Sequence, residues 1–195
     1  MFDKILDQGV DGKVTIGNIR SKNSQCVINS KKRHVIIEDN CSFLNSNIFL
    51  EGENIHLIIR RGVRFCGNIT IKGDNSYLYI GEHSTFERCN IVALGGKRIS
   101  IGKDCMISYD VEIRNTDAHP IYSLDGLRLN DDKDSTIGDH VWISAHTSSL
   151  KGVQICDNII IGTRSVVNKN CNTPYSIYAG VPAVLKKYGV KWERK

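Results

Sequence analysis

The chain has 195 residues, 41% hydrophobic and 24% charged, which suits one folded domain and gives no sign of disorder. Its formal net charge of +5 is spread along the chain without a basic stripe of interleaved aromatic residues, which argues against a nucleic-acid partner. Seven cysteines, an odd number with no C-x-x-C pair, argue against a disulfide framework and favour reduced thiols.

The N-terminal residues Met1–Asp7 are too polar for a signal peptide, and no apolar run has the length that a membrane span needs. We therefore expect a cytoplasmic protein. The modest positive charge leaves two interpretations open. It favours an anionic ligand, such as a phosphorylated cofactor or an acidic glycan, or it reflects ordinary variation of a solvated surface.

A repeat runs through most of the chain and predicts its fold. Isoleucine recurs with steps of 21 or 22 residues, and from residue 137 to 167 the lead positions fall every six residues. A six-residue period fits neither a helix nor an alternating strand, but it fits a short strand and a turn, three times per coil. The lead residues of the early coils are Ile16, Ile37, Ile59, Ile80 and Ile101, then Phe43, Phe65, Phe86 and Ile107, then Phe49, Ile71, Val92 and Ile113.

These lead residues are expected to point inward and to stack from coil to coil in a parallel β-helix, a triangular solenoid. The early coils exceed three hexapeptides by a few residues, which predicts a small loop on each, as at 73–75 and 95–97. We interpret the whole chain, residues 1–195, as a single all-β solenoid domain.

Two segments interrupt the repeat. Residues 117–135 are polar and too long for a hexapeptide, so we predict an extruded loop, which in a tight solenoid is usually functional or disordered. After Val167 the pattern fades, and residues 173–195 are expected to cap the open end as a short helix or as a tail strapped over the last coil.

His119 is the strongest catalytic candidate because it lies in the long loop. An alcohol is nearly neutral at pH 7, so acyl transfer to it needs a base, and histidine suits that task. Asp117 either orients the ring or binds a substrate hydroxyl, or else caps a turn. Trp142 occupies a place where small or polar residues are usual, so it either faces a groove or fills a corner. Tyr109 and Asn115 are further candidates for substrate binding.

Several segments resemble the hexapeptide acyltransferases, a group that includes galactoside, maltose and xenobiotic acetyltransferases and the O-acetyltransferases of capsules, sialic acids and O-antigens. The match is dense over 101–187, while earlier coils match only in period. The loop Asp117-Ala118-His119-Pro120 looks most like the polysaccharide and sialate branch. The segments that carry the resemblance are IGDHVWI (137–143), LKGV (150–153), IGTRSVV (161–167) and YSIYAGVPA (175–183).

The resemblance implies a left-handed coil and a homotrimer with three acetyl-CoA sites between subunits. It implies that His119 is the base and that Trp142 positions the acyl end. Arg164 stands where the family prefers glycine, and Asn168 where it prefers threonine, which puts cofactor contacts there in doubt. The cofactor positions that we expect are Trp142, Ser144, Ala145, Gly162, Thr163, Arg164, Asn168, Lys169 and Lys187, with Ser144 also our candidate for the oxyanion donor.

We therefore predict an acetyl-CoA-dependent O-acetyltransferase that acts on a sugar hydroxyl by direct transfer and uses no metal. N-acetylation of an amino-sugar is the main alternative. A β-helix zinc carbonic anhydrase would need His119, His140 and His146, but the six-residue gap between the last two places them on different prism faces. A non-catalytic scaffold is the remaining alternative. The acceptor, the group acylated and the acyl chain length stay open, with charge and loop type favouring an anionic glycan.

Overall fold

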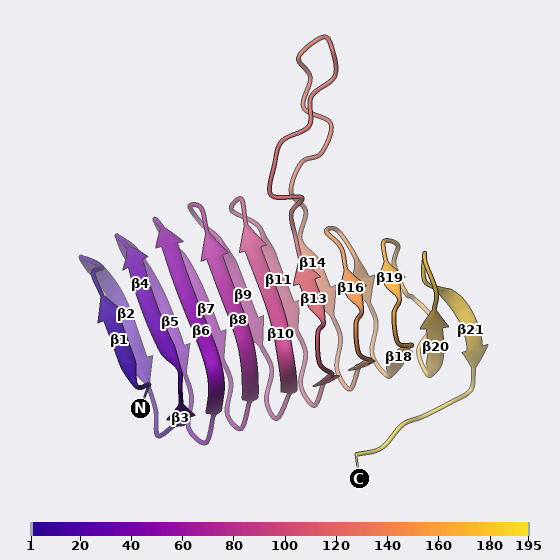
Figure 1. Cartoon of the computed structure of the whole chain (residues 1–195), viewed down its shortest axis with the longest axis horizontal. Coiled ribbons are helices and arrows are strands. Elements are labelled where there is room, and N and C mark those ends of the chain that lie inside the picture. The colour runs from indigo at the N-terminus through magenta and orange to yellow at the C-terminus, as the bar shows by residue number, and fades with distance from the viewer. Residues whose placement is uncertain (1, 195) are drawn as a thin grey trace.

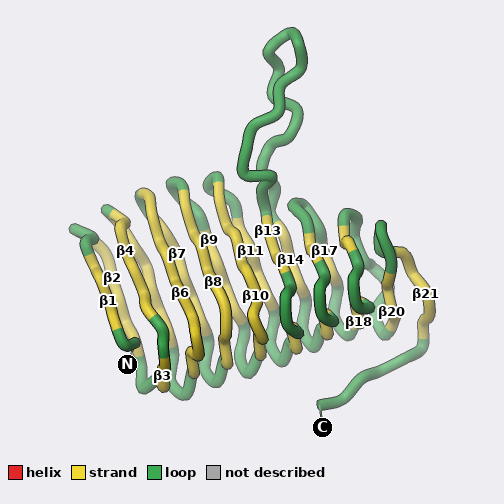
Figure 2. Tube along the Cα trace, viewed as in Figure 1, coloured by secondary structure: helices red, strands yellow, loops and turns green. Residues whose placement is uncertain are grey.

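The computed structural model describes residues 2–194, and every regular element in that range is a β-strand (Figure 2). The strands wind into a left-handed parallel β-helix whose coils stack along one long axis (Figure 1). The predicted fold class is therefore confirmed. Within residues 2–194 no helix is long and apolar enough to cross a membrane.

Two hydrogen-bonded sheets build the three walls of the prism. One wall is a separate sheet of β2 (Asp11–Ile16), β5 (Lys32–Ile37), β7 (Ile55–Ile59), β9 (Tyr77–Ile80), β11 (Arg98–Ile101), β14 (Ser135–Ile137) and β17 (Gln154–Ile155).

The other two walls are joined, because three long strands bend around their common corner before the later coils split into separate short strands. This sheet contains β1 (Lys4–Asp7), β3 (Arg20–Lys22), β4 (Gln25–Ser30), β6 (Ser42–Gly52), β8 (Arg64–Lys72), β10 (Thr85–Leu94), β12 (Met106–Ile107), β13 (Glu112–Arg114), β15 (Trp142–Ile143), β16 (Ser148–Ser149), β18 (Ile159–Ile161), β19 (Val166–Val167), β20 (Ser176–Ala179) and β21 (Val184–Tyr188).

The register of the strands confirms the isoleucine repeat. The lead isoleucines pair from coil to coil, so that Ile37 lies between Ile16 and Ile59, and Ile101 lies between Ile80 and Ile137. The phenylalanine column is also confirmed, with ring centroids 5.2 Å apart for Phe65 and Phe86. These side chains form one continuous apolar core along the axis.

The prediction for the third column, Phe49, Ile71, Val92 and Ile113, is partly wrong. Ile71 and Ile113 are buried as predicted, but Phe49 and Val92 are only half-buried, and Leu50 and Ala93 point inward instead. The corners before them carry an extra residue in a left-handed conformation, at Asn45 (φ 49°) and Arg88 (φ 48°), where the strand pairing shifts register. That extra residue reverses which residues face inward.

A column of small residues lines another edge of the core, and it includes two cysteines. Cys41 and Cys105 are buried beside Val63 and Ser84. Burial raises the pKa of Cys105 to about 12 and also raises the pKa of Cys41. These thiols are therefore packing groups that remain protonated at neutral pH.

The long loop leaves the solenoid after β13 and returns at β14, as predicted. It projects from one corner as an irregular hairpin with an antiparallel bridge between Tyr122 and Arg128 (Figure 1). Its apolar side chains are turned to solvent, with Leu124 fully exposed and Leu127 68% exposed.

The C-terminal cap is a strand and a tail, and the helix alternative is not found in the described chain. β21 pairs antiparallel with β20 at the end of the solenoid. Residues 191–194, which we call the strap, then run back along the coils (Figure 1). The strap lies against residues far earlier in the sequence, including Thr85 and His140.

Candidate active site

A polar clip closes the foot of the long loop. Lys151 Nζ lies 2.5 Å from Asp117 Oδ2 and donates to the Asn130 carbonyl oxygen at 2.9 Å. The Asn130 amide donates to the carbonyl of His119 at 2.9 Å and to Asp117 Oδ2 at 3.0 Å, and its oxygen accepts from the Ile121 N–H at 2.6 Å. Both arms of the loop are therefore tied together around His119.

The clip fixes the backbone of His119 and leaves its ring exposed. The His119 N–H donates to the Asp117 carbonyl at 2.8 Å, and Ala118 takes a left-handed conformation with its N–H bonded to Thr116 Oγ1. The His119 ring makes no hydrogen bond, ion pair or aromatic contact with residues 2–194. A histidine presented in this way is accessible to a hydroxyl acceptor.

Asp117 belongs to the clip. The hydrogen bond from Lys151 lowers the pKa of Asp117. Burial opposes this to a lesser extent, and the hydrogen bond from the Asn130 amide lowers the pKa further. The carboxylate is therefore charged at neutral pH and directed at these two groups. In residues 2–194 the Asp117 carboxylate holds Lys151 and Asn130, and its role toward the His119 ring or a substrate hydroxyl stays a prediction.

Trp142 lies on a different wall from the loop. In β15 it pairs with Met106 on one side and Ile160 on the other, and its indole is half-buried. Its Nε1 is buried without a hydrogen-bond partner in residues 2–194, and it lines a groove of about 960 Å³. A buried N–H without a partner is available to a ligand. No described contact joins Trp142 to His119, so a single chain does not bring them together.

Several predicted cofactor residues meet at one corner of the C-terminal coils. The Thr163 hydroxyl donates to the Ala145 carbonyl at 2.8 Å, and the Arg164 N–H donates to the same oxygen at 3.0 Å. Ser144 precedes Ala145, and Gly162 precedes Thr163. Arg164 has φ 54°, the left-handed conformation that glycine adopts most readily, so the departure from glycine keeps the turn and adds an exposed guanidinium.

The remaining cofactor positions lie further along the same end. Asn168 and Lys169 are exposed after β19, and Lys187 is exposed in β21. The side chains of Lys169 and Lys187, like that of Arg164, form no ion pair with the described residues. These three cations are therefore free to meet an anionic ligand.

The two other substrate candidates differ in exposure. Asn115 is fully buried, where its side-chain oxygen accepts from the Leu94 N–H at 2.8 Å and its amide donates to the Leu94 carbonyl. This pairing ties neighbouring coils together. Tyr109 is 44% exposed at the corner after β12 and packs edge-on against His146 at 5.1 Å.

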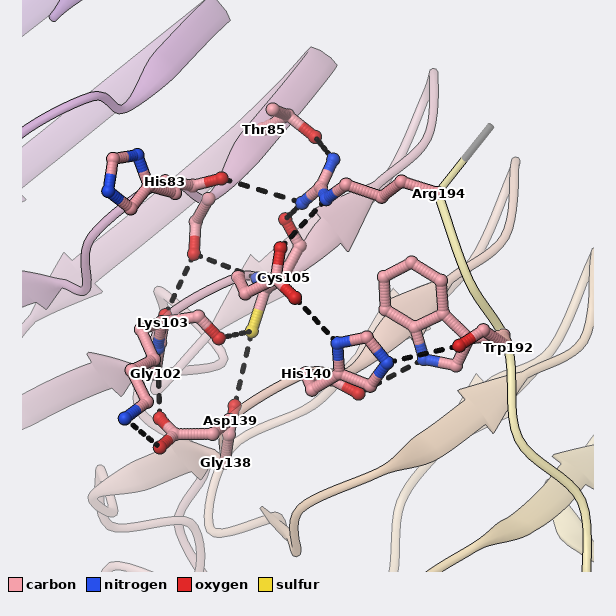
Figure 3. A network of polar contacts seen from close by, with 12 residues as sticks. His83, Thr85, Gly102, Lys103, Cys105, Gly138, Asp139, His140, Trp192 and Arg194 are labelled. Atoms are coloured by element: carbon pink, nitrogen blue, oxygen red, sulfur yellow. Dashed lines mark hydrogen bonds and ion pairs between the residues drawn. The ribbon is translucent and has the colours of Figure 1, made fainter. Parts of the chain in front are cut away.

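His140 holds the strap. Its ring stacks on Trp192 at 4.1 Å and 7°, its Nδ1 lies 2.6 Å from Asp104 Oδ2, and the Trp192 indole donates to its carbonyl at 3.0 Å (Figure 3). His146 faces Asp110 at 3.6 Å. No three metal-binding side chains gather in the part of the chain that is described.

The sequence interpretation missed Asn130 and Lys151. It predicted a C-terminal tail strapped over the last coil, but not the contacts of that tail with Thr85 and His140. Asn130 and Lys151 lie 13 and 34 residues from Asp117, and nothing in the repeat marks them. Trp192 was the one available signal, because it is an isolated bulky aromatic residue in a basic tail.

Comparison with known proteins decides the family. No protein-family model matches the chain. A polysialic acid O-acetyltransferase from Neisseria meningitidis is 38% identical over 191 residues, which cover 97% of this chain and 89% of that protein. This chain belongs to the hexapeptide-repeat O-acetyltransferase family.

Solved structures of this family agree with that assignment. A polysialic acid O-acetyltransferase superposes with a TM-score of 0.83 at 33% identity, covering 98% of this chain and 92% of that one. A polySia-specific acetyltransferase gives 0.86 at 28% identity, covering 98% and 82%. The chain is thus an acyltransferase of sugar hydroxyls, as predicted. This assignment leaves the amino-sugar, scaffold and carbonic anhydrase alternatives without support.

Proposed function

We propose that this enzyme transfers acetyl from acetyl-CoA to a hydroxyl of a polymeric, sialic-acid-type glycan, with His119 as general base. The observation that carries the proposal is the 38% identity to the Neisseria meningitidis protein over nearly the whole chain. The charge of +5 suits an acidic acceptor. We place the reaction in the cytoplasm, where acetyl-CoA is made.

The proposed reaction needs no covalent enzyme intermediate. The His119 ring accepts the proton of the acceptor hydroxyl as its oxygen attacks the thioester carbonyl. The carbon–sulfur bond then breaks, and the CoA thiolate leaves and takes up the proton from His119. Trp142 positions the acyl end with its free indole N–H, and Ser144 is our candidate donor to the thioester oxygen.

We assign acetyl-CoA to the corner formed by Ala145 and Thr163. Arg164, Lys169 and Lys187 are exposed and form no ion pair with the described residues, so their charges suit the phosphates of the cofactor. Asn168 belongs to the same surface.

We further propose that the active enzyme is a homotrimer with sites between subunits. His119 and Trp142 lie on different walls of one chain, so a neighbouring copy is needed to bring a base and a tryptophan together. The exposed leucines of the loop, including Leu124 and Leu127, suit burial against such a neighbour. Sedimentation equilibrium tests this, and a monomer with full activity would contradict it.

The decisive experiment measures release of free CoA from acetyl-CoA with polysialic acid, neutral glycans and an amino-sugar as acceptors. Loss of the base in His119→Ala should lower the rate by about 10² to 10⁴. His34→Ala, at a half-buried histidine in β5, is the matched control and should keep the wild-type rate. Equal rates for wild type and His119→Ala would refute the base, and turnover with none of the sugars would refute the proposed function.

A further inference from the structure

A long trough runs along the outer face of the solenoid. The groove beside Trp142, of about 960 Å³, continues into a second hollow of about 320 Å³, because Ser42 and Arg64 line both. Arg20 and Cys66 also belong to the lining. We call this continuous surface the trough.

The trough floor is one column of paired strand residues. Arg20 pairs with Ser42, Ser42 with Arg64, Arg64 with Thr85, Thr85 with Met106, and Met106 with Trp142. Five steps at about 4.8 Å between strands give a length of roughly 24 Å. That length accommodates several linked sugars in an extended chain, and one end of it reaches Trp142.

The strap forms one wall of the trough. Arg194 Nε lies 2.8 Å from Asp104 Oδ1, its Nη1 donates to Thr85 Oγ1 at 2.9 Å and its Nη2 donates to the Cys105 carbonyl at 2.7 Å (Figure 3). Trp192 is 6% exposed against His140. These contacts make the wall a fixed part of the fold.

Two arginines of the floor have no partner. Arg20 and Arg64 are exposed, and their guanidinium groups make no hydrogen bond or ion pair with residues 2–194. Elsewhere on the surface, Arg60 pairs with Glu38 at 2.7 Å and Arg88 with Asp110 at 3.1 Å. An unpaired guanidinium in a groove is suited to bind a carboxylate in a bidentate manner.

The other charges of the trough do not cancel these arginines. Glu193 is paired with Lys191 at 2.8 Å within the strap. Glu87 also lines the trough, and it forms no ion pair within residues 2–194. The trough therefore keeps a positive balance toward its Arg20 end.

We propose that the trough binds a polymeric acidic glycan lengthwise, with sugar carboxylates on Arg64 and Arg20 and the reacting sugar beside Trp142. This inference rests on the proposed function, because it assigns the acceptor site of that reaction. The corner of Ala145 and Thr163 is not part of the trough lining, so it stays free for acetyl-CoA. Trp142 then lies between the glycan site and the acetyl-CoA site.

The test compares long and short acceptors. Arg64→Gln and Arg20→Gln/Arg64→Gln are titrated by calorimetry with polysialic acid of long and of very short defined length, without acetyl-CoA. The double variant should bind the long polymer at least about tenfold more weakly, because it lacks two charge-assisted contacts, and should bind the short acceptor as wild type does. Arg61→Gln, an exposed arginine of the same coil outside the trough, is the matched control.

Turnover separates the two proposals. The KM for the long polymer should rise at least about tenfold in the double variant, while kcat and the KM for acetyl-CoA stay unchanged. If the wild-type enzyme binds the long polymer more tightly than the double variant does, but releases no CoA, the proposed function is refuted and the trough is supported. The trough proposal would be overturned if the double variant bound the long polymer as tightly as wild type, or bound long and short acceptors with equally reduced affinity. A change in the sedimentation mass of the variant would also overturn it.

Discussion

Replacement of Lys151 by methionine tests whether the clip at the foot of the loop controls His119, the proposed base. Met has a similar unbranched side chain but removes the ion pair to Asp117 at 2.5 Å and the hydrogen bond to the Asn130 carbonyl at 2.9 Å. The rest of the clip, from Asn130 to His119, remains. The expected result is a looser loop on an intact solenoid.

The free-energy cost of Lys151→Met depends on how exposed the side chains of Lys151 and Asp117 are. The Lys151 side chain is 16% exposed, but Asp117 is 40% exposed, so water compensates part of the loss. A hydrogen bond to a charged group contributes about 1.5–3 kcal/mol, and exposed ion pairs contribute about 0–1 kcal/mol. We take about 1–2 kcal/mol, which shifts the foot of the loop toward its open form by roughly 5- to 30-fold.

Two measurements check this value. Amide hydrogen exchange at Ile121, whose N–H donates to Asn130, should accelerate by that factor, and kcat/KM should fall by up to the same factor. Lys13→Met, at an exposed lysine of β2, is the control and should change neither. Unchanged exchange and unchanged turnover would refute the reasoning, and lost turnover with unchanged exchange would mean that Lys151 contacts substrate.

Two further predictions concern the strap and the core. Burial alone would raise the pKa of Asp104, but hydrogen bonds from Arg194 and His140 outweigh it and lower that pKa. The charged Asp104 carboxylate therefore stabilises the docked strap fully at pH values above the ordinary aspartate pKa of about 3.9. This stabilisation is lost as the pH falls through the lowered pKa. Tryptophan fluorescence should report strap release in that acid range, and Asp104→Asn should lack this step. In the core, Ile59→Ala should lower the free energy of unfolding by about 2–5 kcal/mol in urea titration, and a loss below 1 kcal/mol would contradict tight packing around this fully buried side chain.

The repeat predicts the fold because each coil buries the same positions against its neighbours. Ile37 and Ile101 could therefore be placed from spacing alone. Phe49 and Val92 could not, because a single left-handed corner residue reverses the inward face, and a six-residue count does not register it. The long loop was evident as a break in the period.

The site was less predictable than the fold. His119 was proposed because it is a histidine in the single long insertion, and the role proposed for Trp142 came from family resemblance. The partners that hold them depend on contacts between distant segments, such as Lys151 with Asp117 and Trp192 with His140. Such contacts are set by how coils and tail pack, and no local pattern encodes them.

The distribution of thiols gives the trough a natural attachment point for a probe. Burial raises the pKa of Cys26 and Cys171 to about 12 and raises the pKa of Cys89 further, so these groups react slowly with alkylating dyes. Cys66 is half-buried within the trough lining, and Cys156 is the other half-buried thiol, where burial raises the pKa. A maleimide fluorophore should therefore label Cys66 ahead of the buried thiols. That dye would report occupancy of the trough in the unaltered protein.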